Sequence, residues 1–348
     1  MEQNVWLIVM AGGIGSRFWP VSTEEKPKQF LDMLGIGKTL FQQTIDRFND
    51  ICPKENIVVV TSQKYTGIVK EQCPELLCEN ILAEPFMRNT APCIAYACYK
   101  IKKKDPQAIV VVTPADHLIF ETGIFQQAIN NGIVFVKSRS AILTLGITPH
   151  SPETGYGYIQ MDDKNEDFSK VRAFKEKPDY VTAEAYLNAG GFLWNAGIFL
   201  WNNDTIISAF EKYNPKMANA FSKGESFYYT DREQDFINNI YPDCENISID
   251  YCIMEKADNL YVCEAHFQWS DLGTWSALWE KADKNLQGNS SSSKKTSFYE
   301  SSNNIVHVDS QKKVVIQGLN NFIVVDANDV LLICSKKEEQ RIKEFKNK

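Results

Sequence analysis

The sequence predicts an α/β protein built on a doubly wound, mostly parallel sheet, with a small β-rich domain at its C-terminal end. Short apolar runs rich in β-branched residues recur through the first 150 residues, and segments with helical periodicity separate them. Closely spaced apolar clusters also recur beyond residue 300. The first pattern is typical of βαβ units, and the second of a small all-β unit.

Four apolar runs are the predicted strands of the sheet: Val5–Met10, Ile57–Thr61, Ile109–Thr113 and Ala141–Ile147. They are apolar almost throughout because helices cover both faces of such strands. The first run follows Glu2 and stops at Gly12, which favours a buried strand over a secretion signal. Thr90–Lys104 has helical periodicity, and we predict Thr90 as its N-cap.

The remaining elements are shorter. We predict a helix from about Thr205 to Tyr213 with Asp204 as its cap, and another over Ser248–Ala257. The polar segment Gly288–Lys295 is predicted as a linker or mobile loop, which divides the chain into domains 1–285 and 286–348. The apolar clusters after it predict a short β-helix or roll, and the last charged residues a terminal helix or tail.

Composition excludes several classes of protein. The 348 residues suit about two domains. With 37 basic and 44 acidic residues the net charge is -7, which disfavours a nucleic-acid partner. No run approaches the ~18 apolar residues that would span a membrane. The nine cysteines form no CxxC pair, so we expect buried, reduced thiols in a cytoplasmic protein.

A glycine-rich turn, Ala11–Pro20, follows the first predicted strand. Glycine lets backbone amides approach phosphates, and Arg17 adds a fixed donor, although a tight turn alone also favours glycine. Phe18 stands where a dinucleotide-binding GxGxxG motif needs its third glycine. Gly37-Lys38-Thr39 lacks the leading glycine of a P-loop, since Asp32 occupies that place.

Extended to Pro27-Lys28-Gln29-Phe30, this turn resembles the signature of the sugar-1-phosphate nucleotidyltransferases, and in particular their mannose-1-phosphate guanylyltransferase branch. Seven further blocks resemble that family in its order: Asn89–Pro92, Pro114–His117, Thr154–Tyr158, Phe174–Pro178, Asn195–Phe199, Ile249–Glu255 and Trp269–Trp275. The resemblance covers residues 1 to about 285. Thr23 departs from it, because many relatives carry Arg there.

The resemblance implies an enzyme that forms GDP-mannose and pyrophosphate from GTP and mannose 1-phosphate, by attack on the α-phosphorus. Both reactants are anionic, so a divalent cation, Mg²⁺, is expected. Asp116 follows the predicted strand Ile109–Thr113 and suits a metal ligand. The resemblance supplies Asp271 as the second ligand. Either residue could instead be a turn former.

The resemblance also assigns the other site residues. Arg17 would bind the β- and γ-phosphates and Lys28 the α-phosphate, which makes them catalytic with Asp116 and Asp271. The nucleotide would contact Ala11, Gly12, Gly13, Gly15, Ser16, Glu84, Asn89 and Thr90. Glu84 can accept from both N1–H and the 2-amino group of guanine. The sugar phosphate would contact Gly155, Tyr156, Glu176, Lys177 and Asn195. Asp250 and Glu255 receive no role, and the pair Glu176-Lys177 could be a solvated strand end.

Two alternatives stay open at this point. One is the same chemistry with another base or sugar, such as dTTP and glucose 1-phosphate. The other is a non-catalytic regulatory module on the same fold, which the presence of Arg17, Lys28, Asp116 and Asp271 disfavours. An exposed edge of the C-terminal β-unit would allow a homodimer.

Overall fold

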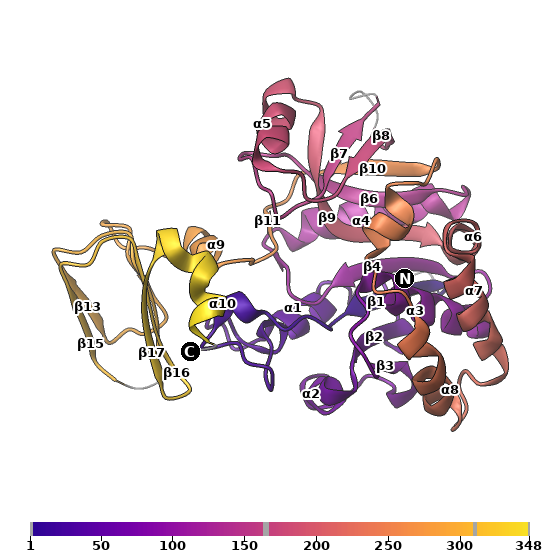
Figure 1. The fold of residues 1–348 in the computed structure, drawn as a ribbon, viewed down its shortest axis with the longest axis horizontal. Coiled ribbons are helices and arrows are strands. Elements are labelled where there is room, and N and C mark those ends of the chain that lie inside the picture. The colour runs from indigo at the N-terminus through magenta and orange to yellow at the C-terminus, as the bar shows by residue number, and fades with distance from the viewer. Residues whose placement is uncertain (1–2, 163–166, 309–311, 347–348) are drawn as a thin grey trace. The chain divides into compact units, whose positions relative to one another are not determined.

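The computed structural model describes residues 3–162, 167–308 and 312–346 (Figure 1). The chain divides into two compact units, each assembled from separate stretches of sequence. The sheet unit comprises residues 1–12, 45–115 and 119–269. The coil unit comprises residues 13–44, 116–118 and 270–348.

One mixed sheet organises the sheet unit. Within the described residues it has nine strands, in the order β3 (Ile81–Glu84), β2 (Ile57–Ser62), β1 (Val5–Met10), β4 (Ile109–Pro114), β9 (Phe192–Asn202), β6 (Ile142–Ile147), β10 (Leu260–Ala265), β8 (Ser169–Lys175) and β7 (Tyr158–Met161). β1 pairs in parallel with β2 and β4, and β6 with β10. Within this sheet β8 and β9 run in the direction opposite to the other seven strands. The predicted mostly parallel sheet is confirmed, and the four predicted strands are β1, β2, β4 and β6.

Helices cover both faces of this sheet. The helices that lie wholly in the sheet unit are α2 (Thr66–Gln72), α3 (Thr90–Lys104), α4 (Thr122–Lys137), α5 (Tyr180–Ala189), α6 (Asn203–Tyr213), α7 (Pro215–Ser222) and α8 (Glu233–Ile240). Trp6 and Ile8 of β1 share an apolar core with α3, α6 and α7, which lie together (Figure 1). On the other face, a Cβ added to Gly132 of α4 would lie 3.0 Å from Leu143 and Leu200, so glycine allows α4 to pack closely there.

The strand-bearing part of the coil unit, residues 290–335, is a short β-helix. Its strands are β12 (Ser290–Ser291), β13 (Thr296–Tyr299), β14 (Ile305–Val308), β15 (Val314–Gln317), β16 (Phe322–Ala327) and β17 (Val330–Ser335), and α9 (Trp275–Lys281) and α10 (Ile342–Phe345) also belong to this unit. β12, β14 and β16 stack in parallel, as do β13 and β15, whereas β17 pairs antiparallel with β16. Parallel stacking of successive turns is the geometry of a β-helix. The structure therefore selects the β-helix over the roll. α1 (Leu40–Asp46), β5 (Leu118–Ile119) and β11 (Trp269–Ser270) lie where the chain passes between units.

The segment predicted as a linker forms the first turn of this β-helix. Asn289 is buried, and its Oδ1 accepts from Asn304 Nδ2 at 2.9 Å. Asn304 Nδ2 also donates to Leu319 O at 2.7 Å, which ties three successive turns together. Polar composition misled the prediction because these amide side chains hydrogen-bond one another inside the unit instead of facing water.

Three local predictions need correction. Asn89, not Thr90, caps α3, because its Oδ1 accepts from the first helical amide. Asn202, not Asp204, caps α6, because its Oδ1 accepts from Asp204 N at 3.0 Å. The helix predicted over 248–257 is a π-helix confined to Asp250–Met254. No helix among the described residues is long and apolar enough to cross a membrane.

Candidate active site

The glycine-rich turn is held in shape by side chains of the coil unit. Gln29 Nε2 donates to Gly13 O at 2.8 Å, and Ser22 Oγ donates to Ile14 O at 3.0 Å. Gly15 has φ 60°, and a Cβ there would lie 2.9 Å from the Lys28 side chain. Only glycine fits this close approach without strain. The glycine-rich turn therefore packs against the block Pro27–Phe30. Both are parts of the one signature found in the sequence.

Gly15 starts the 3₁₀ turn Ser16–Phe18, which orients Arg17. The ring of Phe18 is buried and lies 5.0 Å from the ring of Trp275, centroid to centroid. This contact anchors the turn, so that Arg17 remains exposed while one of its nitrogens donates to Gly273 O at 3.1 Å. The guanidinium keeps further donors for a ligand, because one hydrogen bond uses only one of its five N–H groups.

Lys28 is the centre of the coil-unit site. It is only 7% exposed. Its Nζ lies 3.1 Å from Asp116 Oδ2, 2.7 Å from Asp271 O and 2.8 Å from Leu272 O. An ammonium has three donors, and these contacts use all of them. Lys28 therefore binds the residue after β4 to the Asp271 turn, although the two are far apart in sequence, and it is not the solvated surface residue that composition alone would suggest.

Asp116 is ionised in this arrangement. Burial by itself would raise the pKa of Asp116, but the positive charges of Lys28 and His117 outweigh it and lower that pKa below its ordinary value. The second carboxylate, Asp271, accepts from Gly273 N at 2.9 Å through Oδ1, which fixes the turn. A Cβ on Gly273 would lie 2.8 Å from Asp271 Oδ2, so glycine lets the carboxylate fold back over the turn.

These two carboxylates fit a Mg²⁺ site. Mg²⁺ is commonly bound by one or two carboxylates together with substrate phosphates and water, not by a complete protein cage. The described residues contain no cluster of three or more acidic, His or Cys side chains that could hold a metal alone. Asp116 and Asp271 would therefore supply the protein's share of such a site, with oxygen donors of the kind Mg²⁺ prefers.

Glu84 lies at the carboxyl end of β3 in the sheet unit. It is 7% exposed, and its Oε1 accepts a hydrogen bond from the hydroxyl of Tyr241. Its other oxygen, Oε2, lies 3.4 Å from the place where Gly12 would carry a Cβ. Burial raises the pKa of Glu84 to about 7, and the Tyr241 hydrogen bond opposes that rise. A buried acceptor thus faces the start of the glycine-rich turn.

The side chains of Asn89 and Thr90 form hydrogen bonds that stabilise the start of α3 and the segment packed against it. Asn89 has φ 67° and caps the helix. Thr90 Oγ1 accepts from Ile249 N at 2.9 Å, and Ala91 N donates to Ile247 O at 3.1 Å. The start of α3 therefore holds the segment that leads into the π-helix. Ala11, whose amide donates to Val60 O at 2.8 Å, begins the turn from within the sheet.

The residues expected to bind the sugar phosphate gather at the ends of β7, β8 and β9. Glu176 is buried, and its Oε1 pairs with Lys177 Nζ at 2.7 Å, so only the Lys177 side of this pair faces solvent. Lys177 N donates to Tyr156 O, and Asn195 N to Gly157 O, which joins the three segments. Gly155 is exposed beside them.

Asp250 and Glu255, which receive no site role from the sequence alone, support this group. Asn195 Nδ2 donates to Asp250 Oδ1 at 3.0 Å, and Glu255 Oε1 accepts from Glu176 N at 3.1 Å. Burial, followed by repulsion from Glu176, raises the pKa of Asp250 to about 7. The available signal was the block Ile249–Glu255 itself, in which a carboxylate stands at each end of the mostly apolar run Tyr251–Met254.

Gly157 was also missed. A Cβ at this position would lie 2.5 Å from Glu176 Oε2, a distance that real contacts do not reach. The carboxylate occupies the space that a side chain would take. The five-residue block around Gly157 thus contains a glycine that the Glu176 carboxylate requires.

The expected site residues fall into two groups. The coil-unit group consists of Gly13, Gly15, Ser16, Arg17, Lys28, Asp116 and Asp271. The sheet-unit group consists of Ala11, Gly12, Glu84, Asn89, Thr90, Gly155, Tyr156, Glu176, Lys177 and Asn195. The first group offers cations and two carboxylates for phosphate and metal. The second offers the buried carboxylates of Glu84 and Glu176 and the exposed cation of Lys177.

Comparison with known proteins agrees with this chemistry. A model of the nucleotidyl transferase family matches residues 7–288. The chain is 35% identical over 354 residues to mannose-1-phosphate guanylyltransferase 2 of Escherichia coli O157:H7, covering 97% of this chain and 72% of that protein. Identity to the mannose-1-phosphate guanylyltransferase of Klebsiella pneumoniae is 35% over 345 residues, with the same coverage. A Thermus thermophilus structure described as mannose-1-phosphate geranyltransferase superposes with a TM-score of 0.89 at 26% identity, over 99% of both chains.

Proposed function

This chain belongs to the nucleotidyl transferase family, and within it to the mannose-1-phosphate guanylyltransferases, and we propose that it makes GDP-mannose from GTP and mannose 1-phosphate. A phosphate oxygen of mannose 1-phosphate attacks the α-phosphorus of GTP, and a new P–O bond forms. The bond from the α-phosphorus to the bridging oxygen breaks, and pyrophosphate leaves with the electron pair. No covalent enzyme intermediate is needed, so positioning and charge neutralisation are the protein's task.

The observation that supports this reaction most directly is the Lys28 cluster. One buried ammonium holds the turn of Asp271 and the carboxylate of Asp116 in place. Mg²⁺ held by Asp116 and Asp271 would neutralise charge on the phosphates and orient them. Lys28 contributes positive charge near the α-phosphate, and it also fixes the two ligand-bearing segments. Arg17, with free donors, binds the departing pyrophosphate group.

Base recognition falls to the sheet unit. Guanine presents two adjacent donors, N1–H and the 2-amino group, and an ionised carboxylate is a double acceptor. Glu84 is buried, and its Oε2 faces Gly12 of the same unit, so the sheet unit carries a buried acceptor for a base. The backbone around Asn89 and Thr90 borders the base, while their side chains hold α3 and the following segment in place.

Sugar recognition uses the group around Glu176. Its carboxylate accepts from sugar hydroxyls, and Lys177 pairs with the sugar phosphate. Asn195 retains one amide hydrogen for the sugar after donating the other to Asp250. Gly155 and Tyr156 form the wall, and the ring of Tyr156 packs edge to face against Trp194 at 5.1 Å.

We also infer a cytoplasmic location and a homodimer, with no nucleic-acid partner. All nine cysteines are free, as in a reducing compartment. Strand β17 is an edge of the coil-unit sheet and exposes Leu331 and Ile333, which supports self-association through this edge. Light scattering on the purified protein measures the oligomeric state directly.

The reaction is tested by measuring pyrophosphate release. Each nucleoside triphosphate is combined with mannose 1-phosphate or glucose 1-phosphate, with and without Mg²⁺. We expect metal-dependent release confined to GTP with mannose 1-phosphate. Release with another pair would show that the enzyme uses a different nucleotide or sugar phosphate. If a folded, nucleotide-binding protein released no pyrophosphate with any pair, the enzyme function would be contradicted.

A further inference from the structure

A tyrosine far from Glu84 in the sequence controls the orientation of its carboxylate. Tyr241 follows α8 directly and is completely buried, at 0% exposure. Its hydroxyl donates to Glu84 Oε1, which leaves Oε2 directed at Gly12. A phenol in this position is a hydrogen-bond donor to an anion, so it favours the ionised carboxylate over the neutral acid.

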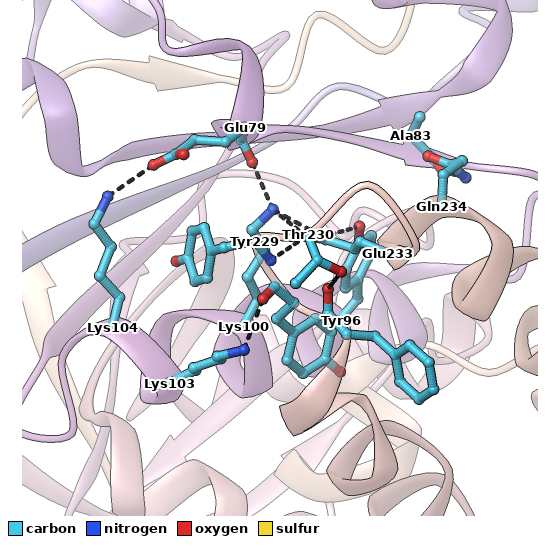
Figure 2. A network of polar contacts seen from close by, with 12 residues as sticks. Glu79, Ala83, Tyr96, Lys100, Lys103, Lys104, Tyr229, Thr230, Glu233 and Gln234 are labelled. Atoms are coloured by element: carbon cyan, nitrogen blue, oxygen red, sulfur yellow. Dashed lines mark hydrogen bonds and ion pairs between the residues drawn. The ribbon is translucent and has the colours of Figure 1, made fainter.

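Helix α8 is anchored firmly enough to hold this contact. At its first residue, Glu233 forms a buried ion pair with Lys100 of α3 at 2.7 Å and accepts from the hydroxyl of Tyr96 at 2.6 Å (Figure 2). Next to it, Gln234 Nε2 donates to Ala83 O at 3.1 Å, the residue just before Glu84 (Figure 2). These contacts fix the position of α8 relative to α3 and β3. They therefore also fix Tyr241, which directly follows α8.

The protonation state of Glu84 decides which base edge it matches. An ionised carboxylate accepts two hydrogen bonds and suits the two donors of guanine. A neutral carboxyl group has one donor and one acceptor, and it suits the 6-amino group and N1 of adenine instead. Loss of the Tyr241 hydrogen bond would thus change the preferred base, and not only the strength of binding.

We propose that Tyr241 is a positioning residue for base selection, whose hydroxyl keeps Glu84 an ionised double acceptor and so makes the site select guanine over adenine. The inference rests on the proposed contact between Glu84 and the base. Tyr241 touches neither substrate nor the reacting atoms, so its effect is confined to the choice and binding of the nucleotide.

Few other groups near Glu84 change charge in the working pH range. The described titratable groups that face it are Tyr241 and, on α3, Cys93, and burial raises the pKa of both far above neutrality. Cys244 lies beside Tyr241 and has a pKa raised to about 11 by burial. Arg88 donates to Pro242 O at 2.7 Å. A pH-dependent change in base selection would therefore report on Glu84.

The test measures kcat/KM for GTP and for ATP, each with mannose 1-phosphate and Mg²⁺, between about pH 5.5 and 8.5, where His and perturbed carboxyl groups titrate. The GTP/ATP ratio cancels the titration of the triphosphate and of the sugar phosphate, because both reactions share them. For the native enzyme we expect the ratio to fall as the pH drops below the pKa of Glu84, about 7.

Tyr241→Phe should lower the GTP/ATP ratio at neutral pH by about tenfold to a hundredfold, the range for a lost hydrogen bond to a charged group. It should also move the midpoint of the pH profile upward by about one unit or more, because the remaining burial favours the neutral acid. Tyr228→Phe is the matched control. Its hydroxyl is equally buried and donates to Phe221 O at 2.7 Å, so it should alter thermal stability but neither the ratio nor the midpoint.

Glu84→Gln separates this inference from the proposed function. Glutamine carries one donor and one acceptor at every pH, so it should lose the preference for GTP and remove the pH dependence of the ratio. A native GTP preference in Glu84→Gln would overturn the base contact and this inference together. A changed preference in Glu84→Gln with a native ratio and midpoint in Tyr241→Phe would overturn only the role of Tyr241. Should Tyr241→Phe not fold, a pH-independent ratio in the native enzyme would also overturn it.

Discussion

The carboxylates of the coil unit and those of the sheet unit lie in opposite electrostatic surroundings. Asp116 lies against the ammonium of Lys28, which keeps the pKa of Asp116 low. Glu84 is buried and Asp250 is half-buried, and neither forms an ion pair with a cation within the described residues; desolvation raises the pKa of each to about 7. The difference matches the ligands that each group would bind. A metal ion needs a permanently charged carboxylate, whereas a base or a sugar hydroxyl is recognised by hydrogen bonds whose pattern depends on protonation.

The two regions also differ in how they hold their side chains. Lys28 and Arg17 of the coil unit are fixed mainly through backbone carbonyl oxygens. In the sheet unit, side chains hold side chains, as Tyr241 holds Glu84 and Asp250 holds Asn195. Loss of one sheet-unit partner therefore leaves another polar group unpaired in a buried place.

Substitution of Asp116 by Asn should have the largest effect. The fold should persist, because the amide has nearly the same shape, but the charge that would bind Mg²⁺ disappears. We expect kcat to fall by about a hundredfold to a thousandfold, as when an electrostatic group of a site is removed. Asp326→Asn is the control, since Asp326 pairs with Lys312 at 2.9 Å in the same unit. Near-native turnover of Asp116→Asn at saturating Mg²⁺ would contradict the metal assignment.

Substitution of Glu84 by Gln should stabilise the protein while it damages GTP use. The folded-state pKa, about 7, lies above the ordinary 4.5, so the folded protein binds more protons than the unfolded chain between those values. The carboxylate consequently costs stability increasingly as the pH rises toward 7. At pH 8 the variant should unfold with a free energy a few kcal/mol higher, and at pH 4 with little change. Urea denaturation at both pH values measures the difference, and an equal effect at both would contradict it.

Gly157→Ala should affect the sugar side selectively. The added methyl group meets the Glu176 carboxylate, which must then move away from its place. We expect KM for mannose 1-phosphate to rise by about tenfold, with KM for GTP nearly unchanged, because small displacements in a binding site are costly. Gly123→Ala is the control, because a Cβ there meets nothing within 4 Å. Equal effects on both substrates would indicate general damage to the fold.

Asp250→Asn should have the smallest effect and the clearest pH dependence. Its raised pKa means that the ionised form destabilises the folded protein, more so as the pH rises toward 7. The variant should therefore gain about 1–3 kcal/mol in unfolding free energy at pH 8 and little at pH 4. Thermal denaturation across this pH range checks the sign. A loss of stability at pH 8 would show that the hydrogen bond with Asn195 outweighs the repulsion from Glu176.

The sequence alone was sufficient to predict the features that depend on residues close together in the chain. The continuous apolar runs determined the four predicted strands, because a strand covered on both faces must be apolar throughout. The placement of Asp116 after such a strand could also be predicted. Helix caps were predicted less well. Asn89 and Asn202 cap the helices, but the nearby Thr90 and Asp204 are also residue types that commonly cap helices.

Only the tertiary structure decided which distant residues meet. Tyr241 and Glu84 are separated by 157 residues, and Lys28 is separated from the Asp271 turn by 243. No periodicity or local propensity connects such pairs, because their contact depends on how strands and helices pack. The same holds for the pKa values of Glu84 and Asp250, since burial is a property of the folded chain and not of a sequence neighbourhood. Sequence therefore determined which chemical groups are present, and packing determined their charge and their partners.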